Sequence, residues 1–369
     1  MDSEPLTAKS VARTYMIEEG TFTKNYKDVL SNFRQWNQKE HAADWVLLPE
    51  NLGPHLGIDE TSYCGEVYTF LHNKDGHGKK GTIVAIIKGV KPDEVCTVLN
   101  QLPEDKRQTV EDVTMDLSEC MSGIVRQSFP NAEIVRDCFH VIQRSGEGLE
   151  EIRLHLKREA IKEQKREKAE HQKKLLRLAK RRTAYRKAHT RPKGKKRGRK
   201  PQRLNTRFVP SKLSNGETLV DCLTKCRRQM QTSRNKWNDR QKERAKILFE
   251  KYPKLKEAYD ICNALRVVFR NHDQDKEAAK VKLHEWYDEV TKCTLREMKA
   301  VKDTVKSYED EILNYFKNFA TNASAESLNS KTKAFRSMLR GVRDLPFFFY
   351  RLSLMFWLVC HRKNLLSRN

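Results

Sequence analysis

Two aspartates stand in short apolar runs that are typical of buried β-strands. Asp59 lies in GIDET and Asp116 in TMDLS, and apolar residues flank each of them. A charged side chain inside an apolar strand needs a partner, a metal ion or an opening to water. Paired carboxylates at strand ends can hold Mg²⁺, and two such ions can drive phosphoryl transfer. Because the chain has 49 acidic residues, two strand aspartates can also occur by chance, and this pattern alone leaves both interpretations open.

A third carboxylate, Glu326, stands in the first turn of a helix predicted over 321–344, which Asn and Ser residues introduce. Polar and basic residues follow on the same helix: Asn329, Ser330, Lys333, Arg336 and Arg340. The first three lie at i+3, i+4 and i+7 from Glu326 and share its face. The helix therefore combines an acid with a row of side chains that can donate hydrogen bonds to phosphates. An ordinary solvated helix face would show the same spacing, so both interpretations stay open.

The positive charge is concentrated in one segment. The net charge of the 369 residues is +24, and residues 157–207 alone hold 23 Lys and Arg against four acids. The first half of this segment predicts a helix, whereas RPKGKKRGRKP at 191–201 is interrupted by Gly and Pro and is expected to be unstructured when free. Such a run repels itself unless a polyanion lies beside it, which predicts a nucleic-acid partner. The residues expected to contact DNA here are Lys193, Lys195, Lys196, Arg197, Arg199 and Lys200.

The elements that must position the acids follow from periodicity. Three strand-like runs are followed by helix, strand, helix and strand, which predicts a mixed α/β sheet with helices packed on it. The expected strands are 57–63, 65–73, 81–90, 110–118 and 132–142, and the expected helices between them are 92–102 and 117–129. Residues 142–320 are helical in pattern throughout. The apolar run 345–360 contains Arg351 and is too short to span a membrane, so it predicts a buried helix.

In combination these motifs resemble the DDE transposases of bacterial insertion sequences, and more narrowly their ISL-three-type lineage. The motifs are GIDETSY, TMDLS, DCFHV and NASAESLNSKTKAFRSMLRGVRD, and the resemblance runs from 36 to 356. It implies a ribonuclease-H-like α/β core, interrupted by an all-α insertion before the final catalytic helix. The expected parts are a helical lead-in at 1–55, the first part of the core at 56–145, the insertion at 146–320 with a basic arm at 171–207, and helices completing the core at 321–369.

The resemblance also implies roles for single residues. Asp59, Asp116 and Glu326 match the three metal-binding acids of the family, which implies Mg²⁺ or Mn²⁺, two ions in all. Asp137 and His140 match an auxiliary Asp/Cys-x-x-His motif of the core. A zinc site would need more ligands than this pair, and the nine cysteines contain no C-x-x-C pair to supply them. His140 is expected to orient a backbone group or contact DNA, and a purely structural histidine is equally consistent with the sequence.

The implied activity is Mg²⁺-dependent cleavage of double-stranded DNA at the element ends, followed by strand transfer into target DNA. The residues expected to bind the DNA phosphates are the basic arm, Asn329, Lys333, Arg336 and Arg340. The implied partners are the element ends, the target and further copies of this chain on DNA, without a membrane. We expect a bacterial cytoplasmic protein that associates with the nucleoid when active. Relatives usually carry an N-terminal zinc-binding and helix-turn-helix segment. No cysteine of such a segment stands before Cys64, so recognition of the element ends is expected to come from the insertion, the basic arm or a separate small polypeptide.

Two other functions fit the sequence. The chain can be a catalytically inactive DNA-binding derivative in which the core is a scaffold, or a structure-directed nuclease that cuts without joining. Kinase and nucleotide-triphosphatase functions lack support, since no G-x-x-x-x-G-K-[ST] loop is present. The N-terminus MDSEPLTAKSVARTY has no apolar stretch of the kind that directs secretion.

Overall fold

The computed structural model describes residues 6–189, 206–319, 321, 323–340 and 342–356. It divides into two compact units, and each is described by itself. Unit 1 comprises Met1–Val141, Phe269–Lys282 and Val305–Asn369, and unit 2 comprises Ile142–Val268 and Leu283–Thr304. Among the described residues, no helix is both long and apolar enough to cross a membrane.

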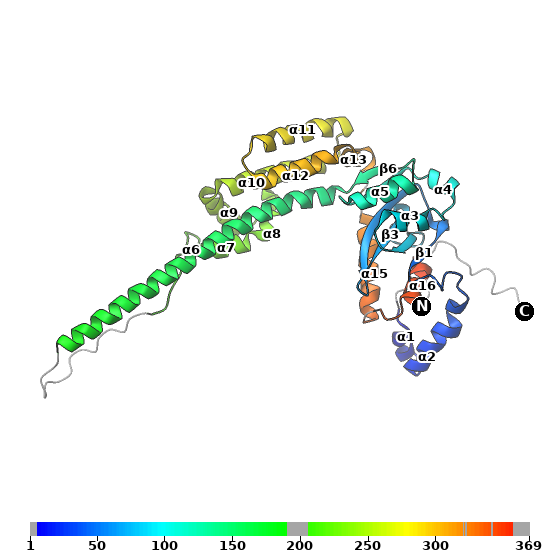
Figure 1. Ribbon diagram of the computed structural model, residues 1–369, viewed down its shortest axis with the longest axis horizontal. Helices are drawn as coiled ribbons and strands as arrows, with labels where there is room; N and C mark the ends of the chain where they lie inside the picture. Colours follow the sequence, from blue (N-terminus) through cyan, green and yellow to red (C-terminus); the bar gives the residue numbers. More distant parts are fainter. Residues whose placement is uncertain (1–5, 190–205, 320, 322, 341, 357–369) are drawn as a thin grey trace, which may run out of the picture. The chain divides into compact units, whose positions relative to one another are not determined.

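Unit 1 is built on one six-stranded mixed sheet (Figure 1). Its strands are β1 (Trp45–Leu47), β2 (His55–Tyr63), β3 (Glu66–Asn73), β4 (Ile83–Lys88), β5 (Asp112–Met115) and β6 (Glu133–Arg136). The order is β1-β4-β3-β2-β5-β6, with β5 and β6 parallel to β2 and the other neighbours antiparallel. This is a ribonuclease-H-like α/β arrangement, as the resemblance implied. All five predicted strands are present, although most are shorter than expected.

The first strand was not predicted, because its three residues lie within the expected helical lead-in. β1 forms through its pairing with β4, where Val46 lies opposite Ile86. A strand this short has no periodicity of its own to read. The rest of the lead-in contains the expected helices, α1 (Ala8–Thr14) and α2 (Glu19–Asn25).

One face of the sheet is covered by α3 (Pro92–Leu99) and α5 (Glu119–Ser128), the two helices predicted between the strands (Figure 1). Their apolar stripes, including Val95, Leu99 and Ile124, are fully buried against Leu56 and Ile58 of β2. A short helix, α4 (Glu104–Gln108), lies between α3 and β5 in the chain. Because side chains alternate along a strand, Asp59, the neighbour of Ile58, faces the other side of the sheet.

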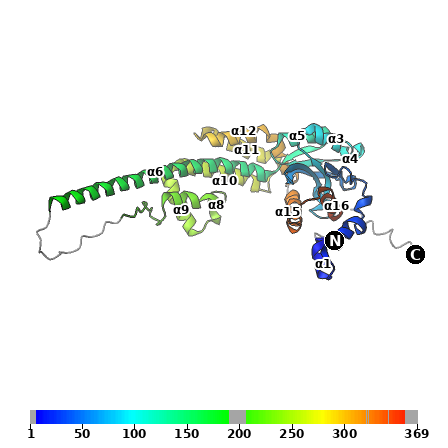
Figure 2. The same cartoon turned by 60° about the horizontal axis from the view of Figure 1, so that its bottom comes forward.

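The opposite face is covered by α15 (Ala323–Met338) and α16 (Leu345–Phe356), which lie side by side in both views (Figure 2). Phe335 of α15 stacks on Phe348 of α16 at 5.5 Å, and both pack with Tyr63 of β2 in a single apolar cluster. The predicted buried helix at 345–360 is confirmed over Leu345–Phe356, and residues 357–360 lie outside the described residues. These contacts place α15 directly over β2, the strand that carries Asp59.

The sequence DCFHVI is helical, which corrects the prediction of a strand through residue 142. β6 ends at Arg136, and α6 (Cys138–Ala188) begins two residues later. The Asp137 carboxylate accepts a hydrogen bond from the Phe139 backbone N–H at 3.2 Å, so it satisfies one of the free donors at the helix start. α6 then runs unbroken for 51 residues (Figure 2) and includes the helix predicted in the first half of the basic segment.

The remaining helices form unit 2 and the parts of unit 1 that follow it in the chain. They are α7 (Leu219–Lys225), α8 (Arg227–Met230), α9 (Asp239–Lys251), α10 (Pro253–Arg270), α11 (Lys276–Lys292), α12 (Arg296–Ser307), α13 (Glu309–Leu313) and α14 (Tyr315–Asn318). Apolar side chains of these helices are core residues: Leu255 and Tyr259 of α10 and Leu283 of α11 are fully buried. Residues 269–282 and 305–319, which were expected within the insertion, belong to the unit that contains the sheet.

Candidate active site

Strand register places three aspartates at neighbouring positions on the sheet. Along the parallel pair β2 and β5, Gly57 lies opposite Thr114. Continuing this register by two residues sets Asp59 level with Asp116, on the same face of the sheet. The pairing of Met115 with Arg136, on β5 and β6, leads in the same way to Asp116 and Asp137. Residues that the sequence separates by up to 78 positions thus stand level with one another on three neighbouring parallel strands.

Asp59 is half-buried and is held by two donors. Its Oδ2 accepts a hydrogen bond from Asn329 Nδ2 at 2.6 Å, and its Oδ1 accepts one from the Glu60 backbone N–H at 2.8 Å. Burial nevertheless raises the pKa of Asp59 above its ordinary value, and the negative charge of Asp116 raises it further. The two carboxylates are therefore close enough to repel each other, as two ligands of one cation are before the cation binds.

Asp116 stands just after β5, in a tight turn. Its Oδ1 accepts a hydrogen bond from the Ser118 backbone N–H at 2.9 Å. Within the described part of the chain, neither Asp116 nor Asp59 forms an ion pair with a lysine or an arginine. Glu60, which the sequence alone did not single out, is a further acid near this pair. Burial raises its pKa, and so do the charges of Asp116 and Asp59. The site therefore carries uncompensated negative charge.

His140 belongs to the same group of side chains. In the first turn of α6, its Nδ1 lies 3.1 Å from Oδ2 of the buried Asp137. The hydrogen bond with Asp137 raises the pKa of His140, and the charges of Asp116 and Asp59 add to this effect. The structure thus places His140 within electrostatic reach of both strand aspartates, and Asp137 holds its ring.

The helix α15 contacts β2 beside Asp59. Asn329 donates to Asp59 and accepts a hydrogen bond from Thr61 Oγ1 at 3.0 Å, so its amide is occupied by the protein. Arg336 donates to the Ser62 carbonyl at 3.1 Å and lies over the Tyr63 ring. Of the other residues predicted to contact DNA in this part of the chain, Lys333 of α15 and Arg340, which follows the helix, are exposed to solvent.

Glu326 lies one helical turn before Asn329, and its side chain is exposed. In the regions that the structure describes, no group of three His, Cys, Asp or Glu side chains is close enough to hold a metal ion. The structure thus brings Asp59 and Asp116 together but does not bring Glu326 into one ligand set with them. Three carboxylates repel one another when no cation lies between them. This repulsion favours a solvent-exposed position for the outermost carboxylate, Glu326.

A buried polar network lies on the same sheet face, nearer the start of β2. Asp112 accepts hydrogen bonds from Lys74 Nζ at 2.6 Å and is 2.5 Å from His55 Nδ1, and Lys74 also donates to Thr114 Oγ1 at 2.8 Å. Sequence reasoning missed this network, because its members come from two strands and a turn that share no common motif. It compensates the charge of Asp112 and so distinguishes this buried aspartate from Asp59 and Asp116.

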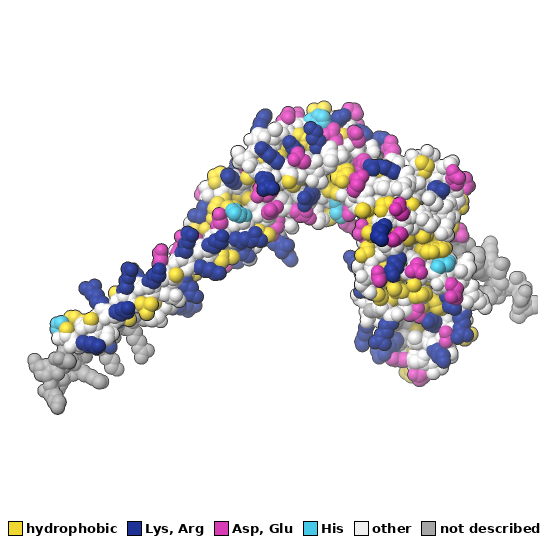
Figure 3. Space-filling model, in the orientation of Figure 1, with side chains coloured by type: hydrophobic (Ala, Val, Ile, Leu, Met, Phe, Trp, Pro, Cys, Tyr) yellow, Lys and Arg dark blue, Asp and Glu magenta, His cyan; other side chains and the backbone are white. Residues whose placement is uncertain are grey.

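The predicted DNA contacts of the basic arm, from Lys193 to Lys200, lie outside the described residues. The described part of the basic segment is the helix α6, whose Lys and Arg side chains line much of the face visible in Figure 3. Lys173, Lys174 and Arg177 are among its exposed residues.

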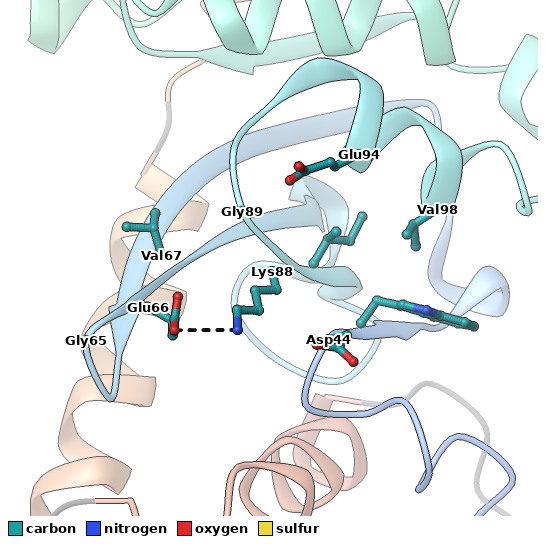
Figure 4. A pocket seen from close by; sticks show the side chains of 10 residues that line it. Asp44, Gly65, Glu66, Val67, Lys88, Gly89, Glu94 and Val98 are labelled. Atoms are coloured by element: carbon teal, nitrogen blue, oxygen red, sulfur yellow. Dashed lines mark ion pairs between the residues drawn. The ribbon is translucent and has the colours of Figure 1, made fainter.

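A separate cavity of 540 Å³ opens near the β2–β3 turn (Figure 4). Its lining includes the ion pair of Lys88 with Glu66 at 3.5 Å, and the carboxylates of Asp44 and Glu94. Neither Asp59 nor Asp116 lines this cavity.

No curated protein and no solved structure matches the chain. A family model does match: the ISL3 DDE family, described as transposase, over residues 56–352. The match begins in β2, which carries Asp59, ends in α16, and includes the helical insertion. It covers well over half of the chain, so this protein belongs to the ISL3-type family of DDE transposases.

Proposed function

We propose that this transposase cuts DNA at the ends of an insertion sequence and transfers the freed strand into target DNA, with two divalent ions held by Asp59, Asp116 and Glu326. The observation that carries the proposal is the pair Asp59 and Asp116. They stand at the same level on two parallel strands. The charge of Asp116 raises the pKa of Asp59, and both charges raise the pKa of Glu60. Within the described chain, no lysine or arginine forms an ion pair with either aspartate.

The donor set fits Mg²⁺ or Mn²⁺. Carboxylate oxygens are the ligands that these hard cations prefer. When bound, the ions would activate the attacking hydroxyl and stabilise the leaving oxygen of an in-line phosphoryl transfer. The compensated Asp112, which Lys74 neutralises, offers no comparable excess of charge. This contrast supports Asp59 and Asp116 as the metal ligands.

Other side chains would hold these ligands in place. Asn329 fixes one oxygen of Asp59, and by donating to it favours the ionised form of the carboxylate. Asp137 orients His140, which supplies a hydrogen-bond donor beside the acids. The contact of Asn329 with Asp59 also keeps this turn of α15 against β2, and Glu326 stands one turn away. This arrangement supports Glu326 as the third ligand once a cation offsets the repulsion.

DNA would be held by positive charge on α6, by the basic arm that follows it, by Lys333 on α15 and by Arg340, which follows that helix. Contacts of this kind bind phosphates and position the duplex without reading its sequence. Recognition of the element ends would then require a further surface, supplied by another copy of this chain or by a separate small DNA-binding polypeptide.

The test is Asp59→Asn in an assay that uses duplexes with the terminal repeats that flank the reading frame. Removing one metal-ligand charge should abolish Mg²⁺-dependent cleavage and joining, whereas Asp105→Asn, on the exposed surface of α4, should leave both unchanged. Cleavage by Asp59→Asn within a few-fold of the parent protein would contradict the proposal. Cleavage without joining by the parent protein would indicate a nuclease, and DNA binding without cleavage would indicate an inactive derivative.

A further inference from the structure

Arg136, the last residue of β6, has a side chain that is completely buried. It is the largest fully buried side chain described in the chain. Arginine is rarely buried unless every donor finds a partner, because an unpaired buried charge is very costly. The partners of Arg136 therefore indicate what the buried charge holds together.

Two of these partners are backbone carbonyls of the turn that carries Asp116. Arg136 Nη1 donates to the Asp116 carbonyl at 2.6 Å and to the Ser118 carbonyl at 3.1 Å. Its Nη2 donates to Ser122 Oγ at 2.5 Å, in the first turns of α5. The same turn is closed from its other side by the hydrogen bond from the Ser118 N–H to the Asp116 carboxylate. Arg136 thus fixes the backbone from which the Asp116 side chain projects.

The charge of Arg136 is balanced from a distant part of the chain. Its Nε donates to Glu311 Oε2 at 2.7 Å, and its guanidinium lies 4.2 Å from the centre of the Tyr308 ring. Glu311 also accepts a hydrogen bond from Arg126 at 2.8 Å, so one carboxylate bridges β6 and α5. Tyr308 and Glu311 belong to the segment that re-enters unit 1 after α12.

We propose that Arg136 is a positioning residue for Asp116, and that Glu311 and Tyr308 hold Arg136 in the position where it serves. This inference rests on the proposed function, since it assumes that Asp116 is a metal ligand. Residues that orient a ligand from behind it typically change metal affinity by 10- to 100-fold when they are altered. Affinity for the cation would then depend on the segment that follows the helical insertion.

A second ion pair provides a matched control. Lys317 of α14 contacts Glu133 of β6 at 2.6 and 2.7 Å, so it joins the same strand to the same returning segment. This pair makes no contact with the turn at Asp116. If Glu311 only fastens the returning segment to β6, loss of either acid should act alike. If Glu311 positions Asp116, only its loss should weaken the metal site.

The experiment measures Mn²⁺ binding to the full chain from the electron paramagnetic resonance signal of the free ion, alongside thermal unfolding. Glu311→Gln should weaken Mn²⁺ binding about 10-fold, whereas Glu133→Gln should leave it within twofold of the parent protein. Ser122→Ala, which removes one acceptor of Arg136, should act in the same direction with a smaller effect and serves if Glu311→Gln does not fold.

Unchanged Mn²⁺ binding in a folded Glu311→Gln protein, or in Ser122→Ala where Glu311→Gln does not fold, would overturn the inference. Equal weakening in Glu133→Gln would overturn it as well. Asp116→Asn separates this failure from a failure of the proposed function. Parental Mn²⁺ binding by Asp116→Asn would refute the metal site itself. Loss of binding in Asp116→Asn with normal binding in Glu311→Gln would refute only the positioning role.

Discussion

On the sheet face covered by α15 and α16, the charge state and hydrogen bonding of single residues depend on the side chains that neighbouring strands place beside them. Asp112 and Asp116 are four residues apart on one strand line, yet Lys74 neutralises the first and no described cation pairs with the second. His72 is a third case: it pairs in register with Gly57, it is fully buried, and neither ring nitrogen has a hydrogen-bond partner among the described residues. The sequence around His72 does not reveal this environment.

The burial of His72 predicts a pH dependence of stability. Burial, together with a smaller contribution from the charge of Lys74, lowers its pKa to about 3. The folded-state pKa is below the unfolded value near 6.5, so the unfolded chain binds the extra proton and stability falls as pH drops below about 6.5. The loss approaches about 1.4 kcal/mol per pH unit until about pH 3. His72→Met should reduce the slope of the unfolding free energy between pH 7 and 5, measured by urea denaturation.

The matched control for His72 is His77→Asn in the exposed turn that follows β3, where the backbone has a positive φ that Asn tolerates. This variant should retain the pH slope of the parent protein. A His72→Met protein with the parental slope would show that His72 does not remain neutral in the folded state.

At the scale of elements, the link between α15 and β2 decides the environment of Asp59. The helix is anchored by Phe335 and Leu328 in the apolar cluster of this sheet face, and Asn329 follows on an adjacent position of the helix. The sequence predicted this helix and its polar face, but it did not predict the contact of Asn329 with Asp59. Asn329 was predicted to contact DNA, whereas the structure occupies its amide with Asp59 and Thr61.

Removing this link should impair the site without unfolding the helix. Asn329→Ala deletes the donor to Asp59, and loss of a residue that orients a metal ligand should lower cleavage about 10-fold or more at limiting Mg²⁺. Higher Mg²⁺ should restore part of the rate. Ser330→Ala, at the neighbouring exposed position of the same helix, should behave as the parent protein. An Mg²⁺ dependence of Asn329→Ala identical to that of Ser330→Ala would argue against this role.

At the scale of the whole molecule, the net charge of +24 is a property of one segment. Residues 157–207 carry 23 Lys and Arg, and α6 presents those up to Ala188 along a single helix, where many side chains are exposed (Figure 3). A helix so rich in like charge is stabilised when phosphates lie along it. The sheet, in contrast, pairs its buried charges internally, as at Asp112 and Arg136.

The placement of this charge predicts the salt dependence of DNA binding. Replacing Lys173, Lys174 and Arg177 of α6 together by Gln should reduce the slope of log K against log salt by about 2 to 3, since each phosphate contact contributes about 0.9. The slope is measured by fluorescence anisotropy on a labelled duplex. Replacing three exposed lysines elsewhere, Lys91, Lys106 and Lys299, should leave the slope unchanged. Equal effects of the two triple variants would indicate that binding follows net charge alone.

The sequence by itself determined the alternation of strands and helices, the position of the basic segment and the identity of the candidate acids, because each depends on residues close together in the chain. Periodicity accordingly predicted five of the six strands, and it missed β1 and the helical start at Cys138. Tertiary structure alone decided which side chains meet. Asn329 is 270 residues from Asp59, and Glu311 is 175 residues from Arg136. Such contacts arise from strand register and helix packing, which no local pattern encodes.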